Sequence, residues 1–168
     1  IRKSAKDAWK RFQLMEWLKD LNRTDRLNEV GAGLIGDLGV DVLLQSSFAS
    51  KLERLDLKNN DLTDVSVIAL SRSEKLKRLV SLNLSKNNIT DAGAKALAGS
   101  SSLGKLKKLD LNFNRIGDEG ARAIAGSPNF ANLESLKLGQ NKIGTEGAQA
   151  LNESKTLQNL IHPIFGFY

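Results

Sequence analysis

The sequence predicts an α/β solenoid, in which short strands and helices alternate along a stack, and two observations lead to that prediction. Leu recurs at a constant step of 27 residues, as at Leu52, Leu79, Leu106 and Leu133. A helix-forming segment follows each of these positions at the same step. A fixed period of this order is typical of repeat proteins, in which each unit buries its apolar face only by stacking on its neighbours.

The first half of each repeat predicts a short strand followed by a turn. After each of these four Leu residues, Leu comes three and five positions on, Asn comes eight positions on, and Leu or Ile comes ten positions on. This pattern, L-x-x-L-x-L-x-x-N-x-L, is similar to the signature of leucine-rich repeats. Alternate side chains of a strand point to opposite faces, so the Leu side chains face the core. We therefore expect a right-handed α/β horseshoe with a parallel sheet on its concave side and helices outside.

The second half of each repeat predicts a helix. An Asp or Thr precedes each helical pattern: Asp64, Asp91, Asp118 and Thr145. We expect these residues to cap their helices, because the side-chain oxygen can accept a free amide of the first turn. A Gly follows in the first turn of three repeats: Gly93, Gly120 and Gly147. We expect it to let the helix lie close to the sheet, and the Ala-rich runs after it favour helix.

The recurring Asn is expected to have a structural role. Its column is Asn60, Asn87, Asn114 and Asn141. After each strand the chain turns inward and leaves backbone amides and carbonyls without strand partners. A buried Asn side chain can both donate to and accept from such groups. We therefore predict a stacked asparagine ladder in place of a catalytic or ligand-binding function for this column.

The repeat pattern divides the chain into three regions. Residues 1–24 have apolar side chains at helix-like intervals, and we expect an N-terminal helical cap or the end of an upstream region. Residues 25–160 are expected to form the repeat domain, with one degenerate repeat before the four regular ones. Residues 161–168 depart from the repeat pattern, and we expect an irregular C-terminal cap or a truncation edge there.

Residues 87–98 and 114–125 share the pattern N-x-I-x-D-x-G-A-x-x-[LI]-A, which resembles the ribonuclease-inhibitor type of leucine-rich repeat. The resemblance covers roughly residues 25–160 and implies a full helix in every repeat. Members of that family include inhibitors, receptor arms, GTPase activators and bacterial proteins, some of them secreted into host cells. The animal ribonuclease inhibitor is acidic and rich in Cys, whereas this chain has no Cys and a formal charge of +6. The short Ala-rich repeats are similar to those of bacterial proteins, including effectors.

The composition excludes several classes of functional site. The chain has no Cys and only one His, His162, so it can form neither a thiolate metal site nor a multi-histidine site. Its apolar runs are shorter than the roughly 20 residues that span a membrane. We find no nucleophile, base and acid set, and we expect no enzyme activity and no cofactor. We expect a monomeric and cytoplasmic protein, or one secreted into a host cell if it is a bacterial effector.

Two phosphate-binding motifs occur in the letters of the sequence. Gly31, Gly33 and Gly36 spell G-x-G-x-x-G, but Gly36 is in register with Gly117 of a regular repeat, so the repeat explains most of the motif. Residues 99–105 spell G-x-x-x-x-G-K without the Ser or Thr that would hold Mg²⁺. That segment also runs from a helix to a strand, the reverse of a phosphate-binding loop. We therefore predict no nucleotide site.

The side chains between the Leu positions are expected to point onto the concave sheet and to bind a protein or peptide partner. The candidate contact residues are Arg54, Asp56, Lys58, Asn83, Lys86, Lys108, Asp110, Phe113 and Lys137. Ser85 is expected to point the same way. Mixed charges arranged in columns suit a protein partner, because opposite charges set register and steer association. Phe113 is the only outward-facing aromatic residue of these strands, and it is our candidate anchor.

Two alternatives to partner binding on the concave face stay open from the sequence. The repeats could be a structural spacer within a larger protein. They could also bind nucleic acid along a basic edge formed by Lys75, Lys77, Arg78, Lys105, Lys107 and Lys108. The acidic residues among the concave columns and the shortage of aromatics for base stacking make nucleic acid the weaker alternative.

Overall fold

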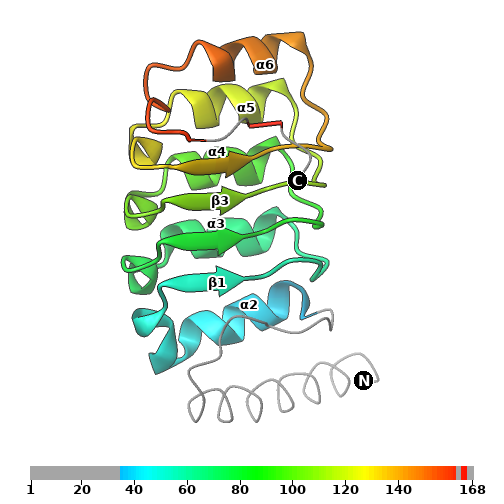
Figure 1. Ribbon diagram of the computed structural model, residues 1–168. Coiled ribbons are helices and arrows are strands. Elements are labelled where there is room, and N and C mark those ends of the chain that lie inside the picture. Colours follow the sequence, from blue (N-terminus) through cyan, green and yellow to red (C-terminus); the bar gives the residue numbers. More distant parts are fainter. Residues whose placement is uncertain (1–34, 162–163, 166–168) are drawn as a thin grey trace.

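The computed structural model describes residues 35–161 and 164–165, and it confirms the predicted α/β solenoid with a parallel sheet. The strands stand side by side in chain order along one face of the stack (Figure 1). They are β1 (Arg54–Asp56), β2 (Ser81–Asn83), β3 (Lys108–Asp110) and β4 (Ser135–Lys137). Each strand pairs with residues 27 positions on, so equivalent residues of the repeats form columns. The predicted cap at residues 1–24 lies outside the described residues.

The helices cover the opposite face of the sheet (Figure 1). They are α2 (Gly36–Gln45), α3 (Asp64–Arg72), α4 (Asp91–Ala98), α5 (Asp118–Ala125) and α6 (Thr145–Asn152). Short 3-10 turns lead from a helix to the next strand: η1 (Ser47–Lys51), η2 (Glu74–Leu76), η3 (Ser101–Leu103) and η4 (Pro128–Phe130). The helix α2 precedes β1 and belongs to the repeat that we describe as degenerate from its sequence.

The core lies between the sheet and the helices. The central Leu of every strand is buried and points inward, and the Leu residues that precede and follow each strand are buried beside it. Phe130 of η4 is also fully buried and fills the return to β4. Each buried Leu contributes about 2 kcal/mol of transfer free energy. The constant Leu spacing is therefore what holds successive repeats in register.

Stacked Asn side chains connect the turns of consecutive repeats. Asn87 is buried, and its Nδ2 donates to the carbonyl oxygens of Leu57 and Leu84 at 3.0 and 2.9 Å. Its Oδ1 accepts the backbone amides of Asn60 and Leu62, both at 3.0 Å. Equivalent bonds to the preceding repeat are made by Asn114 and Asn141. Each side chain thus satisfies backbone groups of its own repeat and of the repeat before it.

The Asp residues at the helix starts and Thr145 of α6 do not cap their own helices, and our expectation for them was wrong. The N-cap position belongs to the residue before, which is Thr63, Thr90, Gly117 or Gly144. Asp91 instead reaches the next repeat, where its Oδ1 accepts the amides of Gly117 and Gly120 at 2.6 and 2.9 Å. Asp37, Asp64 and Asp118 bond the next repeat in the same way. Amides at the starts of α3, α4, α5 and α6 are therefore satisfied by a carboxylate from the neighbouring helix, which also suits the helix dipole.

The Gly in the first helical turn leaves room for this carboxylate. A Cβ added at Gly120 would lie 2.6 Å from Asp91 Oδ1 and 2.7 Å from the Cγ2 of Ile116. Gly93 and Gly147 are equally crowded. In α3 the same position holds Ser66, whose hydroxyl donates to the carboxylate of Asp37. The position therefore requires either the absence of a side chain or a side chain that donates to the carboxylate.

Buried Ser side chains close the carboxyl ends of the helices, a role that we did not predict. Ser100 Oγ donates to the carbonyl oxygen of Ser71 at 2.6 Å, and Ser127 Oγ donates to that of Ala98 at 2.5 Å. Ser154 makes the equivalent bond to Ala125. The last carbonyls of a helix lack partners within the helix. The signal that could have revealed this column is a Ser at every 27th position from residue 46 to residue 154.

The described part of the C-terminal tail continues the backbone pattern of the strands. The amide of Ile161 donates to the carbonyl oxygen of Glu134 at 2.9 Å, and the amide of Leu138 donates to that of Ile164 at 3.1 Å. The same two bonds join β3 to β4 one repeat earlier. The repeat register therefore extends beyond residue 160, where we expected it to end. These are main-chain bonds, which do not depend on the Leu pattern that the tail lacks.

Asp37 should make the stability of the solenoid sensitive to acid. Burial raises the pKa of its carboxyl group, but hydrogen bonds from Ser66 and Thr63 outweigh burial, and the pKa lies below its ordinary value of 3.8. The stabilisation is thus complete above about pH 4 and is lost as the pH falls through the folded-state pKa. We expect the difference in unfolding free energy between wild type and Asp37→Asn to shrink as the pH falls below about 4, as measured by urea denaturation. A difference that stays the same at pH 5 and pH 3 would contradict this role of Asp37.

Candidate partner-binding surface

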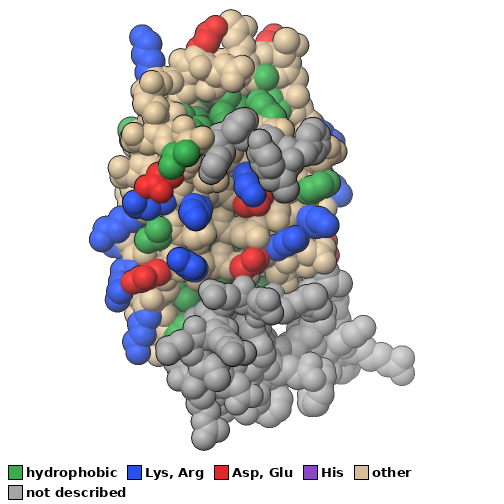
Figure 2. All heavy atoms as spheres, in the orientation of Figure 1, with side chains coloured by type: hydrophobic (Ala, Val, Ile, Leu, Met, Phe, Trp, Pro, Cys, Tyr) green, Lys and Arg blue, Asp and Glu red, His purple; other side chains and the backbone are tan. Residues whose placement is uncertain are grey.

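The concave side of the sheet carries a hollow of about 570 Å³. Six of the nine residues that we predicted to contact a partner line it: Arg54, Asp56, Asn83, Lys108, Asp110 and Lys137. They come from all four strands, because the side chains that flank each buried central Leu point away from the core. Figure 2 shows this face, with blue and red side chains interspersed over the strands. The strand alternation thus brings these six residues together in one depression.

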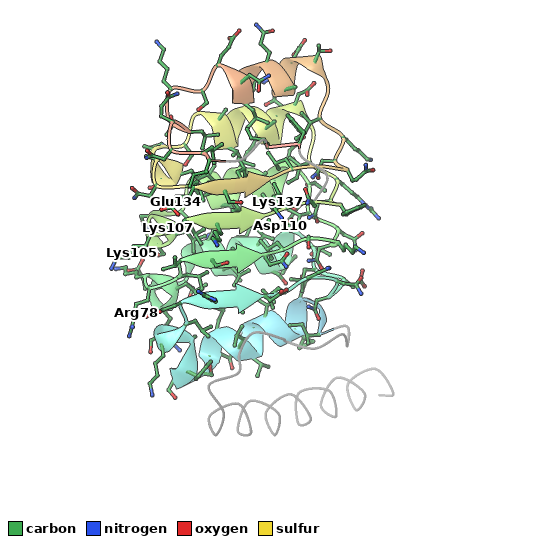
Figure 3. All side chains as sticks on the ribbon, in the orientation of Figure 1. Arg78, Lys105, Lys107, Asp110, Glu134 and Lys137 are labelled. Atoms are coloured by element: carbon green, nitrogen blue, oxygen red, sulfur yellow. The ribbon has the colours of Figure 1, made fainter. Side chains whose placement is uncertain are left out.

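The strand register arranges these side chains in two columns. The first column is Arg54, Ser81, Lys108 and Ser135. The second is Asp56, Asn83, Asp110 and Lys137, and Figure 3 shows Asp110 and Lys137 on adjacent strands. Cations therefore alternate with hydroxyl groups along the first column. In the second column two carboxylates flank an amide, and the last residue is the cation Lys137. A ligand lying across the strands meets both signs of charge.

The acidic column also supports the turns that follow the strands. Asp56 Oδ1 accepts the amide of Lys58 at 2.9 Å, and Asp110 Oδ1 accepts the amide of Asn112 at 3.0 Å. Asn83 Nδ2 donates to Asp56 Oδ2 at 3.1 Å. In Asp110 the second carboxylate oxygen has no hydrogen-bond partner among the described residues. Part of each carboxylate is therefore structural, and Asp110 also lines the hollow.

Three of the nine predicted contact residues do not lie on the strands. Each strand has only three residues, so Lys58, Lys86 and Phe113 fall in the turns that follow. They are exposed, but they do not line the hollow. Ser85, which we expected to point outward, is buried, and its hydroxyl donates to Asn83 Oδ1 at 2.7 Å. Our prediction applied the alternation of a strand to these positions, but the turn begins within two residues of the end of each strand.

Family models described as leucine rich repeat match residues 50–116 and residues 131–151. The chain is a leucine-rich repeat protein. Comparison with curated proteins gives no match.

Among solved structures, the leucine-rich repeat chain is similar to an internalin from Listeria monocytogenes, at 26% identity and a TM-score of 0.40. The similarity covers 66% of this chain and 34% of that one. The chain thus spans about a third of the internalin structure. Leucine-rich repeat proteins are in general binding modules without catalysis of their own. Among the described residues there is no group of acidic or His side chains that could hold a metal ion, and no helix with the length and apolarity needed to cross a bilayer.

The turn residue of each leucine-rich repeat has a left-handed backbone, and Phe113 is the bulkiest side chain in that column. Its φ is 56°, and equivalent angles occur at Asn59, Lys86 and Gln140. Asn tolerates this region, whereas a bulky side chain in it is strained by about 1 kcal/mol. Phe113 is also 50% exposed, so burial of its ring does little to offset the strain. A strained, exposed aromatic at the border of the hollow supports its place in the candidate surface.

Phe113→Asn should therefore stabilise the solenoid. We expect the free energy of unfolding to rise by about 1 kcal/mol, because Asn adopts the left-handed region at little cost. Urea denaturation followed by circular dichroism measures the change. Phe113→Leu is the matched control, since it removes the ring and keeps the strain. Equal stability of the Asn and Leu variants would show that backbone strain is not stored at this position.

The edge at which the strands begin is less basic in effect than its sequence indicates. Figure 3 shows Arg78, Lys105, Lys107 and Glu134 along this edge. Ion pairs join Arg78 to Glu53 at 2.7 Å and Lys107 to Glu134 at 2.7 Å.

Two further cations of this edge also have partners. Lys77 pairs with Glu74, and its hydrogen bond is the main cause of the lowered pKa of the Glu74 carboxyl group. Lys75 donates to three carbonyl oxygens at the end of α2, including that of Leu44 at 2.8 Å. Four of the six cations in this candidate nucleic-acid edge thus already have partners.

Several residues of or beside the candidate surface were not among the nine predicted contact residues. Glu134 and Ile161 line the hollow, and Ile161 is 69% exposed. Ile161 was missed because we expected the repeat register to end before it. Arg115 and Lys142 are exposed in the turns beside Phe113. Their signal in the sequence was their equivalent position, 27 residues apart, next to the turn column.

Proposed function

We propose that this leucine-rich repeat solenoid binds a protein or peptide partner in the hollow of its concave face and catalyses no reaction. The observation that carries the proposal is the convergence of Arg54, Asp56, Asn83, Lys108, Asp110 and Lys137 in one depression. Both signs of charge are present there at fixed register. Such an arrangement discriminates between partners, because a wrongly placed like charge is costly.

The shape of the site supports an extended segment as its ligand. The hollow runs across all four strands, and the central residues Leu55, Leu82 and Leu109 line it between two polar columns. A peptide lying across the strands presents side chains to both columns at once. Exposed Ile161 at one end adds an apolar contact. The predicted anchor Phe113 lies beyond the hollow, in the turn that follows β3.

The test is a selection from a displayed library of random peptides, followed by affinity measurements on the selected sequences by fluorescence polarisation. The double variant Arg54→Glu with Lys108→Glu reverses both cations of the first column. We expect it to weaken the selected peptides at least about tenfold, since it places like charge where the wild type offers attraction. The matched control is Lys105→Glu with Lys155→Glu, which makes the same change in net charge at exposed sites outside the hollow. Equal affinities for the hollow variant and wild type, or no selected peptide, would contradict the proposal.

We also propose that the repeats belong to the ribonuclease-inhibitor-like subtype. The full helix in each repeat supports the ribonuclease-inhibitor-like subtype that residues 87–98 and 114–125 resemble. A bacterial effector role, a cytoplasmic location and a monomeric state stay predictions. Sedimentation of the purified chain tests the last of these.

A further inference from the structure

The turns that follow the strands carry cations that the described residues do not neutralise. Lys86, Arg115 and Lys142 are exposed, and no ion pair within the described part of the chain includes them. Lys86 Nζ lies 5.5 Å from the centroid of the Phe113 ring. We call Lys86, Phe113, Arg115 and Lys142 the turn patch. Figure 2 shows apolar and basic side chains close together beside the strand ends, on the right of the view.

Elsewhere on the solenoid, cations meet carboxylates of a neighbouring repeat. Examples are the pairs Lys95–Glu119, Arg122–Glu146 and Lys107–Glu134, at 3.2, 2.8 and 2.7 Å. These pairs lie on the helices and along the edge where the strands begin. Stacking of repeats therefore pairs opposite charges on two sides of the molecule, and the turn patch differs from both.

In the turn patch, stacking brings like charges together. Arg115 and Lys142 are 27 residues apart, and their amides donate to the equivalent carbonyls of Ile89 and Ile116, each at 2.8 Å. They therefore occupy the same position in adjacent repeats, whose backbones are about 4.8 Å apart. Like charges placed opposite each other in this way are destabilising. A bound anionic group between them would remove the repulsion, and exposed Phe113 beside them offers an apolar contact.

We propose that the turn patch binds acidic side chains of the partner, next to an apolar side chain that covers Phe113. This inference rests on the proposed function, because the patch borders the hollow: Phe113 lies three residues after Asp110, which lines it. The partner is thus a segment rich in Asp and Glu that continues from the hollow over the strand ends. Nucleic acid fits less well, because the patch has a single aromatic side chain and the hollow beside it carries the carboxylates of Asp56 and Asp110.

The test uses the composition and the affinities of peptides selected from a displayed library of random 12-residue sequences. We expect the peptides selected by the wild type to be enriched in Asp and Glu. The double variant Arg115→Glu with Lys142→Glu should bind them at least about tenfold more weakly and should no longer select acidic peptides. The milder pair Arg115→Gln with Lys142→Gln should give an intermediate loss. Lys105→Glu with Lys155→Glu, which matches the charge change away from the patch, should bind like wild type.

The outcomes separate this inference from the proposed function. Selected peptides without an acidic excess, or peptides that the turn-patch variants bind like wild type, would overturn the acidic-partner assignment. If those peptides still lose affinity for the hollow variant, the proposed function stands alone. If they bind the hollow variant like wild type, the proposed function fails, and absence of any selected peptide overturns both. A fluorescent single-stranded oligonucleotide that binds more tightly than the peptides, and depends on the same cations, would assign the patch to nucleic acid.

Discussion

Replacement of Asn87 by Ala is expected to remove a large part of the folding stability of the solenoid. The side chain is buried, donates to carbonyls of its own and the preceding repeat, and accepts two amides of that repeat. Each buried backbone group left without a partner costs about 1 kcal/mol or more. The variant should therefore lose about 4 kcal/mol, out of a total of about 5–15 kcal/mol for a domain of this kind.

Urea denaturation followed by circular dichroism measures this loss, and Asn88→Ala is the matched control. Asn88 is the next residue in the chain, and its side chain makes one exposed hydrogen bond, to Asp61. The control should lose less than about 1 kcal/mol. Comparable losses in the two variants would mean that the ladder position has no special part in stability. A broadened transition in Asn87→Ala would locate the weak interface between neighbouring repeats, since repeat proteins unfold through nearest-neighbour contacts.

Replacement of Gly120 by Ala should destabilise the solenoid by about 3 kcal/mol, although Ala is the better helix former. The added Cβ would lie 2.6 Å from Asp91 Oδ1, and the carboxylate would have to leave the amides of Gly117 and Gly120. Gly120→Ser should be less harmful than Ala, because a hydroxyl can donate to Asp91 as Ser66 donates to Asp37. The expected order of stability is therefore Gly, then Ser, then Ala.

Gly126→Ala is the control for the loss at Gly120. Gly126 follows α5, its φ is −92°, and the nearest atom to an added Cβ is 3.5 Å away. We expect its change in unfolding free energy to be within about 0.5 kcal/mol of zero. In an Asp91→Ala background, Gly120→Ala should cost at least about 1 kcal/mol less than in wild type, because the clashing carboxylate is gone. Additive effects would contradict the role that we assign to Asp91.

Much of the fold follows from the repeat pattern of the sequence. A period of 27 residues fixes which positions form columns, and the Leu positions fix which side chains are buried, because strand alternation is local geometry. The Asn column is equally legible, since only a side chain that both donates and accepts suits a turn between buried strands. Strand alternation also explains why six of the nine predicted contact residues line the hollow.

Lys58, Lys86 and Phe113 lie outside the hollow, because the point at which each strand ends and its turn begins depends on the packing of adjacent turns. All four residues of the turn column adopt the same left-handed backbone, whether the residue is Asn, Lys, Phe or Gln. The residue type therefore does not determine the conformation. Neighbouring turns impose it through main-chain hydrogen bonds from one repeat to the next.

The sequence by itself determined the period, the buried Leu lattice and the excess positive charge of this protein. Only the tertiary structure decided where each polar side chain acts. Asp91 accepts amides of the next helix, whereas the N-cap of its own helix is Thr90. Lys107 forms an ion pair with Glu134 of the following repeat. Arg115 and Lys142, by contrast, meet no carboxylate of the described residues. The physical reason is that these contacts join residues about one period apart, and a column of residue types does not tell whether a side chain turns to its own repeat, to its neighbour or to solvent.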